Sequence, residues 1–140
     1  MTAKEYLQQY RTLNAHIDAK LAQAERLRHL AQMAGQQGNF SGIHSTQPRD
    51  KIGELTAKIV DLETEINDEI DALVDLEREI RGCISKLTNE NQRVVLEMKY
   101  INGRTLDSIA KQLNYSLANI KTIHKCALES LYPIIPFVVV

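Results

Sequence analysis

The sequence lacks several features that define common classes of protein. Tryptophan is absent and aromatic residues are only 5% of the 140 residues. An aromatic platform that stacks single-stranded bases is therefore not expected. The two cysteines, Cys83 and Cys126, lie far apart, and neither has a second Cys or His at metal-ligand spacing. This excludes a disulfide framework or a zinc module and is typical of a reducing cytoplasm.

Long apolar runs, a secretion signal and a catalytic constellation are missing too. The longest apolar run, 137–140, is far too short to span a membrane. The first residues become polar within a few positions, so we expect no signal peptide. The four His are scattered, and the chain has no Gly-rich phosphate loop. We therefore expect no enzyme activity, no cofactor and no metal site.

Charge is nearly balanced overall, with 17 Lys and Arg against 18 Asp and Glu, but it is unevenly distributed. Basic residues outnumber acidic ones by six to three in 1–49 and by eight to four in 81–140. In 50–80 there are eleven acidic and three basic residues. This asymmetry suggests segments with different partners. We interpret the acidic run as the solvated outside of a helix, with a contact for a basic partner as the alternative.

The first segment is predicted to be one long helix. Thr2 and Glu5 form a capping box. An apolar stripe then recurs at steps of three and four: Tyr6, Tyr10, Leu13, Ile17, Leu21, Ala24, Leu27, Ala31 and Ala34. Gly35 supplies a stop signal. Residues 35–49 have no periodicity and contain three Gly and one Pro, so we expect a mobile loop between two helices.

The second segment carries a heptad repeat that predicts a coiled coil. Asp50 can cap its start. Apolar residues return every seven positions, a second set lies between them, and Glu69 is the polar exception. The expected seam is Ile52, Leu55, Ile59, Leu62, Ile66, Leu73, Leu76 and Ile80.

The two long helices have similar lengths, and the first is basic where the second is acidic. These features favour an antiparallel hairpin. A parallel dimer through the second helix is the alternative, and both can coexist in a four-helix homodimer.

The C-terminal third predicts three shorter helices separated by polar turns. The expected helices and caps are 91–101 after Thr88 or Asn89, 106–113 after Thr105, and 117–131 after Ser116. The last two have the spacing of a helix-turn-helix, because Ala110 is small at the crossing point and Asn114 tolerates a left-handed backbone. The expected core is Ile109, Ala110, Leu113, Asn114, Ser116, Ile120 and Ile123, completed by Tyr115. A plain helical hairpin that caps the coiled coil is the alternative.

This stretch resembles region 4 of bacterial sigma factors. The matching residues are Arg93, Val95, Leu96, Lys99, Tyr100, Gly103, Ile109, Ala110, Leu113, Ser116, Ile120, Ala127, Leu128 and Leu131. The resemblance implies a helix-turn-helix that binds double-stranded DNA, with RNA polymerase as a second partner. No segment resembles the sigma region that melts the promoter, so a complete sigma factor is not expected.

The whole layout resembles a group of small phage and prophage proteins of Gram-positive bacteria. The shared motifs are the Lys-Glu-Tyr-Leu-x-x-Tyr start at 4–10, Asp-Lys-x-Gly at 50–53 and Lys-Ile-Val-Asp-Leu-Glu at 58–63. This resemblance implies a phage-encoded transcriptional regulator that acts in the cytoplasm of a bacterial host.

The third short helix is expected to enter the major groove, where the first half of such a helix reads base edges. Asn119 can bond an adenine edge, Lys121 can reach guanine or phosphate, and Thr122 can contact several bases. Flanking cations would neutralise phosphates. The complete expected set is Ala118, Asn119, Lys121, Thr122, His124, Lys125, Arg93, Lys99, Arg104 and Lys111. Ala118 and Asn119 replace charged residues of the sigma pattern, so one copy should bind weakly.

The expected organisation is an all-α protein in three parts: a helical hairpin at 1–87, a helix-turn-helix domain at 88–132 and an apolar, Pro-containing tail at 133–140. The prolines deny the tail an α-helix, and the tail either packs on the rest or docks on a partner. We expect a double-stranded DNA-binding regulator that dimerises through the hairpin. The alternative is an interaction protein that binds RNA polymerase or a host regulator.

Overall fold

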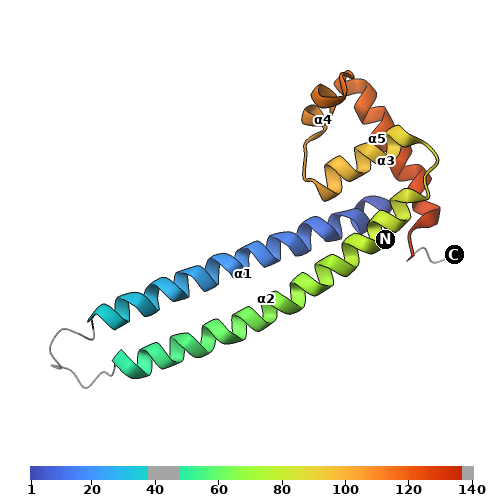
Figure 1. The fold of residues 1–140 in the computed structure, drawn as a ribbon. Coiled ribbons are helices and arrows are strands. Elements are labelled where there is room, and N and C mark those ends of the chain that lie inside the picture. Colours follow the sequence, from blue (N-terminus) through green and yellow to red (C-terminus); the bar gives the residue numbers. More distant parts are fainter. Residues whose placement is uncertain (38–47, 137–140) are drawn as a thin grey trace. The chain divides into compact units, whose positions relative to one another are not determined.

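The structure is a computed structural model that describes residues 1–37 and 48–136 (Figure 1). In these ranges there are helices and no strands, which confirms the expected all-α class. The elements are α1 (Ala3–Gln37), α2 (Pro48–Ser85), α3 (Glu90–Leu96), the π-helix η1 (Glu97–Ile101), α4 (Leu106–Leu113), α5 (Leu117–Leu131) and the 3₁₀-helix η2 (Tyr132–Ile134). They form two compact units: one combines Met1–Asn14 with Leu73–Val140, and the other is Ala15–Ala72.

The expected loop at 35–49 is too long at both ends. Helix α1 continues through Gly35 to Gln37, and α2 begins at Pro48, so Asp50 lies in the first turn and is not the cap. A Cβ atom at Gly35 would lie 3.9 Å from Cδ1 of Ile52. Packing between the two helices therefore extends past the local stop signal, and it overrides the weak helix propensity of glycine. The remaining loop positions, 38–47, lie outside the described residues.

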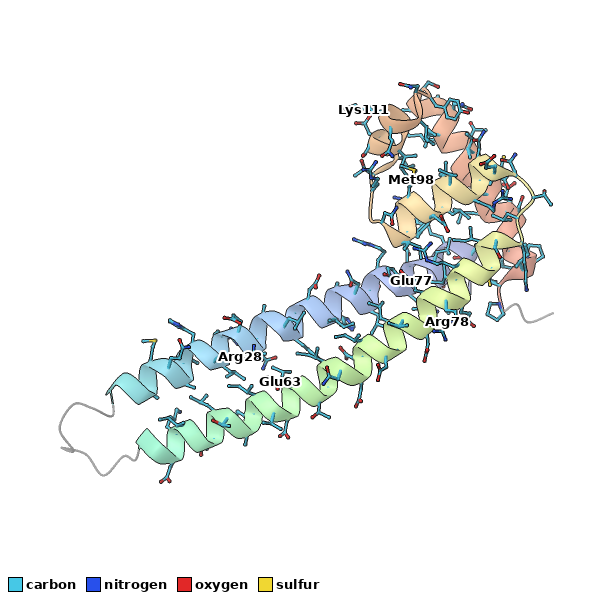
Figure 2. All side chains as sticks on the ribbon, in the orientation of Figure 1. Arg28, Glu63, Glu77, Arg78, Met98 and Lys111 are labelled. Carbon is cyan, nitrogen blue, oxygen red and sulfur yellow. The ribbon has the colours of Figure 1, made fainter. Side chains whose placement is uncertain are left out.

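In the unit Ala15–Ala72, ion pairs join α1 to α2. The ammonium group of Lys20 lies 2.7 Å from Glu69 and 3.4 Å from Glu65, and Arg28 pairs with Glu63 (Figure 2). Numbers rise along α1 as they fall along α2, so the two segments run antiparallel. Glu69, the polar exception in the heptad pattern, is therefore held by a cation from α1.

The expected seam residues are not equally covered. Leu55, Leu62, Ile66 and Ile80 are buried, whereas Ile52, Ile59, Leu73 and Leu76 are half-buried. From α1, Ile17 and Ala24 are buried, but Leu21 is exposed although it lies on the predicted apolar stripe. A single partner helix covers only a narrow face of each helix.

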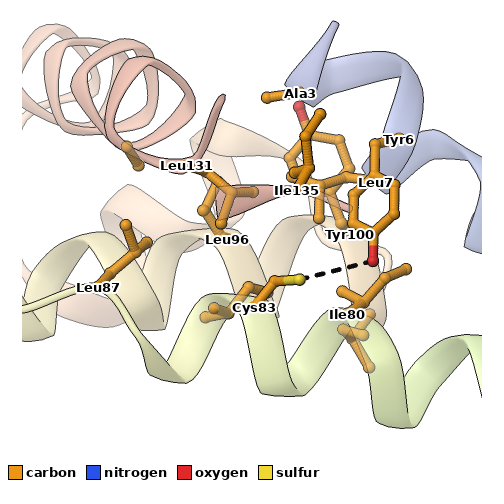
Figure 3. Packing of buried hydrophobic residues seen from close by; sticks show 13 residues of the cluster. Ala3, Tyr6, Leu7, Ile80, Cys83, Leu87, Leu96, Tyr100, Leu131 and Ile135 are labelled. Carbon is orange, nitrogen blue, oxygen red and sulfur yellow. Dashed lines mark hydrogen bonds between the residues drawn. The ribbon is translucent and has the colours of Figure 1, made fainter. Parts of the chain in front are cut away.

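In the unit that combines 1–14 with 73 onward, one apolar cluster joins both ends of the chain. Tyr6 and Leu7 from α1, Ile80 from α2, Leu96 from α3 and Leu131 from α5 are fully buried in it (Figure 3). The Tyr6 hydroxyl lies 3.7 Å from Sγ of Cys83, and burial is the main cause that raises the Tyr6 pKa. This unit therefore includes segments that the sequence pattern assigns to the hairpin.

The start of the tail belongs to this cluster. Tyr132–Ile134 forms a 3₁₀-helix, which the Pro at its start allows because the first N–H of a helix has no partner to lose. Ile135 is only 3% exposed and packs with Leu131 and Ala3. Packing therefore accounts for the first apolar residues of the tail. Residues 137–140 lie outside the described residues.

The helix expected at 91–101 is divided into α3 and η1. The amide of Asn102 donates to the carbonyl of Glu97, which is the five-residue step of a π-helix. Around this wider turn, Tyr100 and Ile101 pack in the first cluster, while Met98 packs in a second one with Val95. The π-helix therefore buries side chains of η1 in both clusters, on two faces of the segment.

Candidate nucleic-acid interface

The helices α4 and α5 begin at side-chain caps. The hydroxyl of Thr105 accepts a hydrogen bond from the amide of Ser108 at 3.1 Å, and the hydroxyl of Ser116 accepts one from the amide of Asn119 at the same distance. Asn89 caps α3 in the same way, through the amide of Gln92. Each cap satisfies an amide that has no partner inside its helix.

The turn between α4 and α5 depends on one left-handed residue. Asn114 has φ 60 and ψ 39, and it is the one residue other than glycine with a positive φ in the described ranges. The next amide, from Tyr115, donates back to the carbonyl of Ala110 at 3.0 Å. This geometry ends α4 and redirects the chain into α5.

A small apolar core holds the two helices on α3 and η1. Ile109 and Ile120 are fully buried, Ala110 is nearly so, and they pack with Val95 and Met98. Leu106, Leu113 and Ile123 are half-buried at its edge. Tyr115 is exposed, contrary to the expectation that it completes the core; its hydroxyl instead accepts a weak hydrogen bond from the Asn91 amide at 3.4 Å.

Residues 117–125 of α5 present one continuous exposed face. Its exposed residues are Leu117, Ala118, Asn119, Lys121, Thr122 and Lys125. Neither lysine forms an ion pair with an acid of the described ranges, and no Asp or Glu occurs between Asn114 and Leu128. The hydroxyl of Thr122 donates to the carbonyl of Ala118, so towards a ligand it offers its lone pairs and its methyl group.

Lys111 lies on the other helix of the motif, and it is partly neutralised. Its ammonium group is 3.1 Å from the carboxylate of Asp107, one turn earlier on α4, and both side chains are exposed (Figure 2). An exposed pair of this kind is weak and is screened by salt. Lys111 therefore remains available to a phosphate.

Two of the expected phosphate contacts are used inside the protein. The Arg93 guanidinium donates to the carbonyl of Leu87, which ties α3 to the turn between α2 and α3. His124 is half-buried, and its Nε2 lies 2.8 Å from the Tyr100 hydroxyl, with the two rings stacked 5.7 Å apart. Because each side chain has one hydrogen bond inside the protein and is half-buried, we assign both residues to holding the fold instead of to phosphate contact.

Burial shifts the pKa values of Tyr100 and His124 in opposite directions. It raises the pKa of Tyr100 to about 12, since the ionised phenol loses its hydration. It lowers the pKa of His124, and the positive charges of Lys99 and Lys4 lower it further. His124 is therefore neutral near pH 7, and we infer that its Nε2 accepts the hydrogen bond of the Tyr100 hydroxyl.

The last two expected residues, Lys99 and Arg104, lie beside the turn that precedes α4. They border a hollow together with Lys4 and Arg11 from the start of α1. No local pattern in the sequence identifies these two α1 residues as part of a site. They are brought to Lys99 and Arg104 only by the packing of α1 in this unit.

In the described ranges, no group of three or more His, Cys, Asp or Glu side chains is placed to hold a metal ion. None of the described helices is both long and apolar enough to cross a membrane.

Residues 83–132, which include α3, α4 and α5, match the family model of sigma-70 region 4. The match supports a helix-turn-helix similar to region 4. It implies a DNA-binding regulatory role for this segment and is compatible with a contact to RNA polymerase. No curated protein and no solved structure matches the chain.

Proposed function

We propose that this chain is a phage- or prophage-encoded transcriptional regulator that binds double-stranded DNA through α5. The observation that carries the proposal is the exposed face of α5 over residues 117–125, which has two unpaired lysines, Asn119 and no acidic residue. A capped helix presented by a left-handed turn is the arrangement that places side chains in the major groove. The phage origin is supported by the resemblance of the motifs at 4–10, 50–53 and 58–63.

In this proposal the residues of α5 have different tasks. Asn119 reads a base edge through its two amide atoms, and the methyl group of Thr122 contacts thymine. Lys121 and Lys125 contact base edges or phosphates, and Lys111 adds a phosphate contact from α4. Ala118 lets the helix approach the groove closely. Regulation follows from occupancy of a promoter, and no catalytic step or cofactor is involved.

The test is fluorescence anisotropy of a labelled duplex titrated with the full chain at several salt concentrations. We expect the double variant Lys121→Gln/Lys125→Gln to bind more weakly, with a salt slope smaller by about 1.8, since each lost phosphate contact removes about 0.9. The matched control is Lys51→Gln/Lys58→Gln, which removes two exposed lysines from α2. Absence of duplex binding by folded protein at low salt would overturn the proposal.

We also propose that α1 and α2 form an antiparallel coiled coil and that the chain assembles as a homodimer through it. The proposal is supported by the heptad pattern and by Val60 and Val74, exposed residues two heptads apart on α2. Sedimentation equilibrium of Val60→Lys/Val74→Lys should give a monomer if this face is the interface. The exposed pair Ala57→Lys/Ala72→Lys adds the same two positive charges at other heptad positions of α2 and is the control.

The alternative function is a protein interaction with RNA polymerase or a host regulator in the bacterial cytoplasm. It is favoured by the apolar start of α5, where Leu117 is 38% exposed and Ala118 follows it. Gel filtration of the chain with purified bacterial RNA polymerase tests it. Co-elution that Leu117→Glu abolishes, together with no duplex binding, would favour this alternative over the first proposal.

A further inference from the structure

A hollow of 590 Å³ lies between the start of α1, η1 and the turn before α4. Its cations are Lys4, Arg11, Lys99 and Arg104, and the hydroxyl groups of Thr12 and Thr105 also border it. All of these residues belong to one compact unit, so the hollow is formed inside that unit. It is separate from the exposed face of α5 described above.

The charge around this hollow is of one sign. No Asp or Glu borders it, and none of its four cations forms an ion pair with an acid in the ranges 1–37 and 48–136. In the same ranges, Lys20, Arg28, Arg81 and Lys111 do have acidic partners. The cations at the hollow are therefore a local excess of positive charge.

The backbone brings these cations close to one another. Gly103 has φ 75, and a Cβ atom there would lie 2.6–2.7 Å from the guanidinium atoms of Arg11. Arg11 therefore lies directly against the turn that carries Arg104. The Lys99 ammonium is 5.7 Å from the centre of the Tyr100 ring. The charges of Lys99 and Lys4 both lower the pKa of His124, which stacks on Tyr100. The four side chains come from three elements around one space.

Like charges held together repel one another, and the repulsion is relieved when a multiply charged anion enters. Two of the four cations are guanidinium groups, whose planar donors match the oxygens of a phosphate. The two threonine hydroxyls add neutral donors. We propose that this hollow binds phosphate groups of a polyanion, with Lys4 and Arg11 as the residues that α1 adds to the site.

The phosphates have two sources, a free polyphosphate such as a nucleotide or the backbone of bound DNA. The DNA source rests on the proposed function, whereas the free source does not. Two measurements on the full chain separate them: calorimetric titration with inorganic triphosphate, and the salt slope of duplex binding by anisotropy. The test variant is Lys4→Gln/Arg11→Gln. The matched control for both measurements is Lys51→Gln/Lys58→Gln, which removes two exposed lysines of α2 that border neither the hollow nor the exposed face of α5.

If triphosphate binding weakens about tenfold or more in the test variant and not in the control, the hollow is a site for free polyphosphate. If the chain does not bind triphosphate and the salt slope of duplex binding is smaller by about 1.8 in the test variant, the hollow binds the phosphates of DNA. Triphosphate binding together with no duplex binding would leave the site standing while the proposed function fails.

Arg11 contacts the turn at Gly103, so a second variant, Lys4→Gln/Arg104→Gln, guards against a loss that comes from misfolding. Circular dichroism melts should show both variants folded, because Lys4, Arg11 and Arg104 are exposed. If neither double variant changes triphosphate binding or the salt slope of duplex binding, the four cations are only a solvated surface, and the proposal is overturned.

Discussion

Substitution of Ile120 by alanine tests whether the small core below α4 and α5 holds α5 in place. Ile120 is fully buried against Ile109, Val95 and Met98. The substitution removes three carbon atoms, which corresponds to a transfer term of about 2.4 kcal/mol. A cavity term adds to this because the core collapses only in part, so we expect a loss of about 3 to 4 kcal/mol.

Leu117, three residues earlier on the same helix, provides the matched control because its side chain is exposed. We expect Leu117→Ala to change stability by less than about 0.5 kcal/mol. Native-state hydrogen exchange of the α4 and α5 amides is the assay, since it reports local opening and does not require the whole chain to unfold in one step. A loss below about 1 kcal/mol in Ile120→Ala, or an equal loss in both variants, would show that this core does not hold α5 in place.

Three further predictions concern single interactions. Asn114→Ala should lower stability in urea by about 1 kcal/mol while Asn114→Gly leaves it unchanged or higher, because φ is 60 there. Burial and nearby cations lower the pKa of folded His124 below 6.5, so the unfolded chain binds the proton more readily. Melting temperature should therefore fall as pH falls below 6.5, and fall less in His124→Gln. Lys20→Met should lower the calorimetric melting temperature because it leaves Glu69 without its cation, and adding Glu69→Leu should restore it.

Local signals in the sequence were sufficient wherever a structural feature depends on neighbouring residues. Thr105 and Ser116 cap α4 and α5 through amides three residues away, and Asn114 takes the left-handed conformation between them. These interactions close within one turn of helix, so residue type and spacing predict them well. The resemblance to sigma region 4 depends on the same local spacing, and the family match covers the same segment.

Predictions from local sequence signals were wrong where packing between residues far apart in the chain outweighs local preference. Gly35 marks a helix end in the sequence, yet α1 continues beyond it because α2 packs alongside. Leu7 and Ile84 are fully buried although neither belongs to the predicted apolar stripe or seam. In their unit each helix contacts more than one neighbour, and a pattern derived for one partner helix misses the additional buried face.

Residue types and their spacing were therefore enough to predict the all-α class, the three capped helices and the exposed face of α5. The hydrogen bond between His124 and Tyr100 depends on the folded arrangement of this unit. So does the position of Lys4 and Arg11 beside Lys99 and Arg104. The physical reason is separation along the chain. These contacts join residues 24 to about 100 positions apart, and no turn, cap or helical period relates positions so distant. Burial of the shared apolar cluster brings them together, and the charges at the surface follow the packing below them.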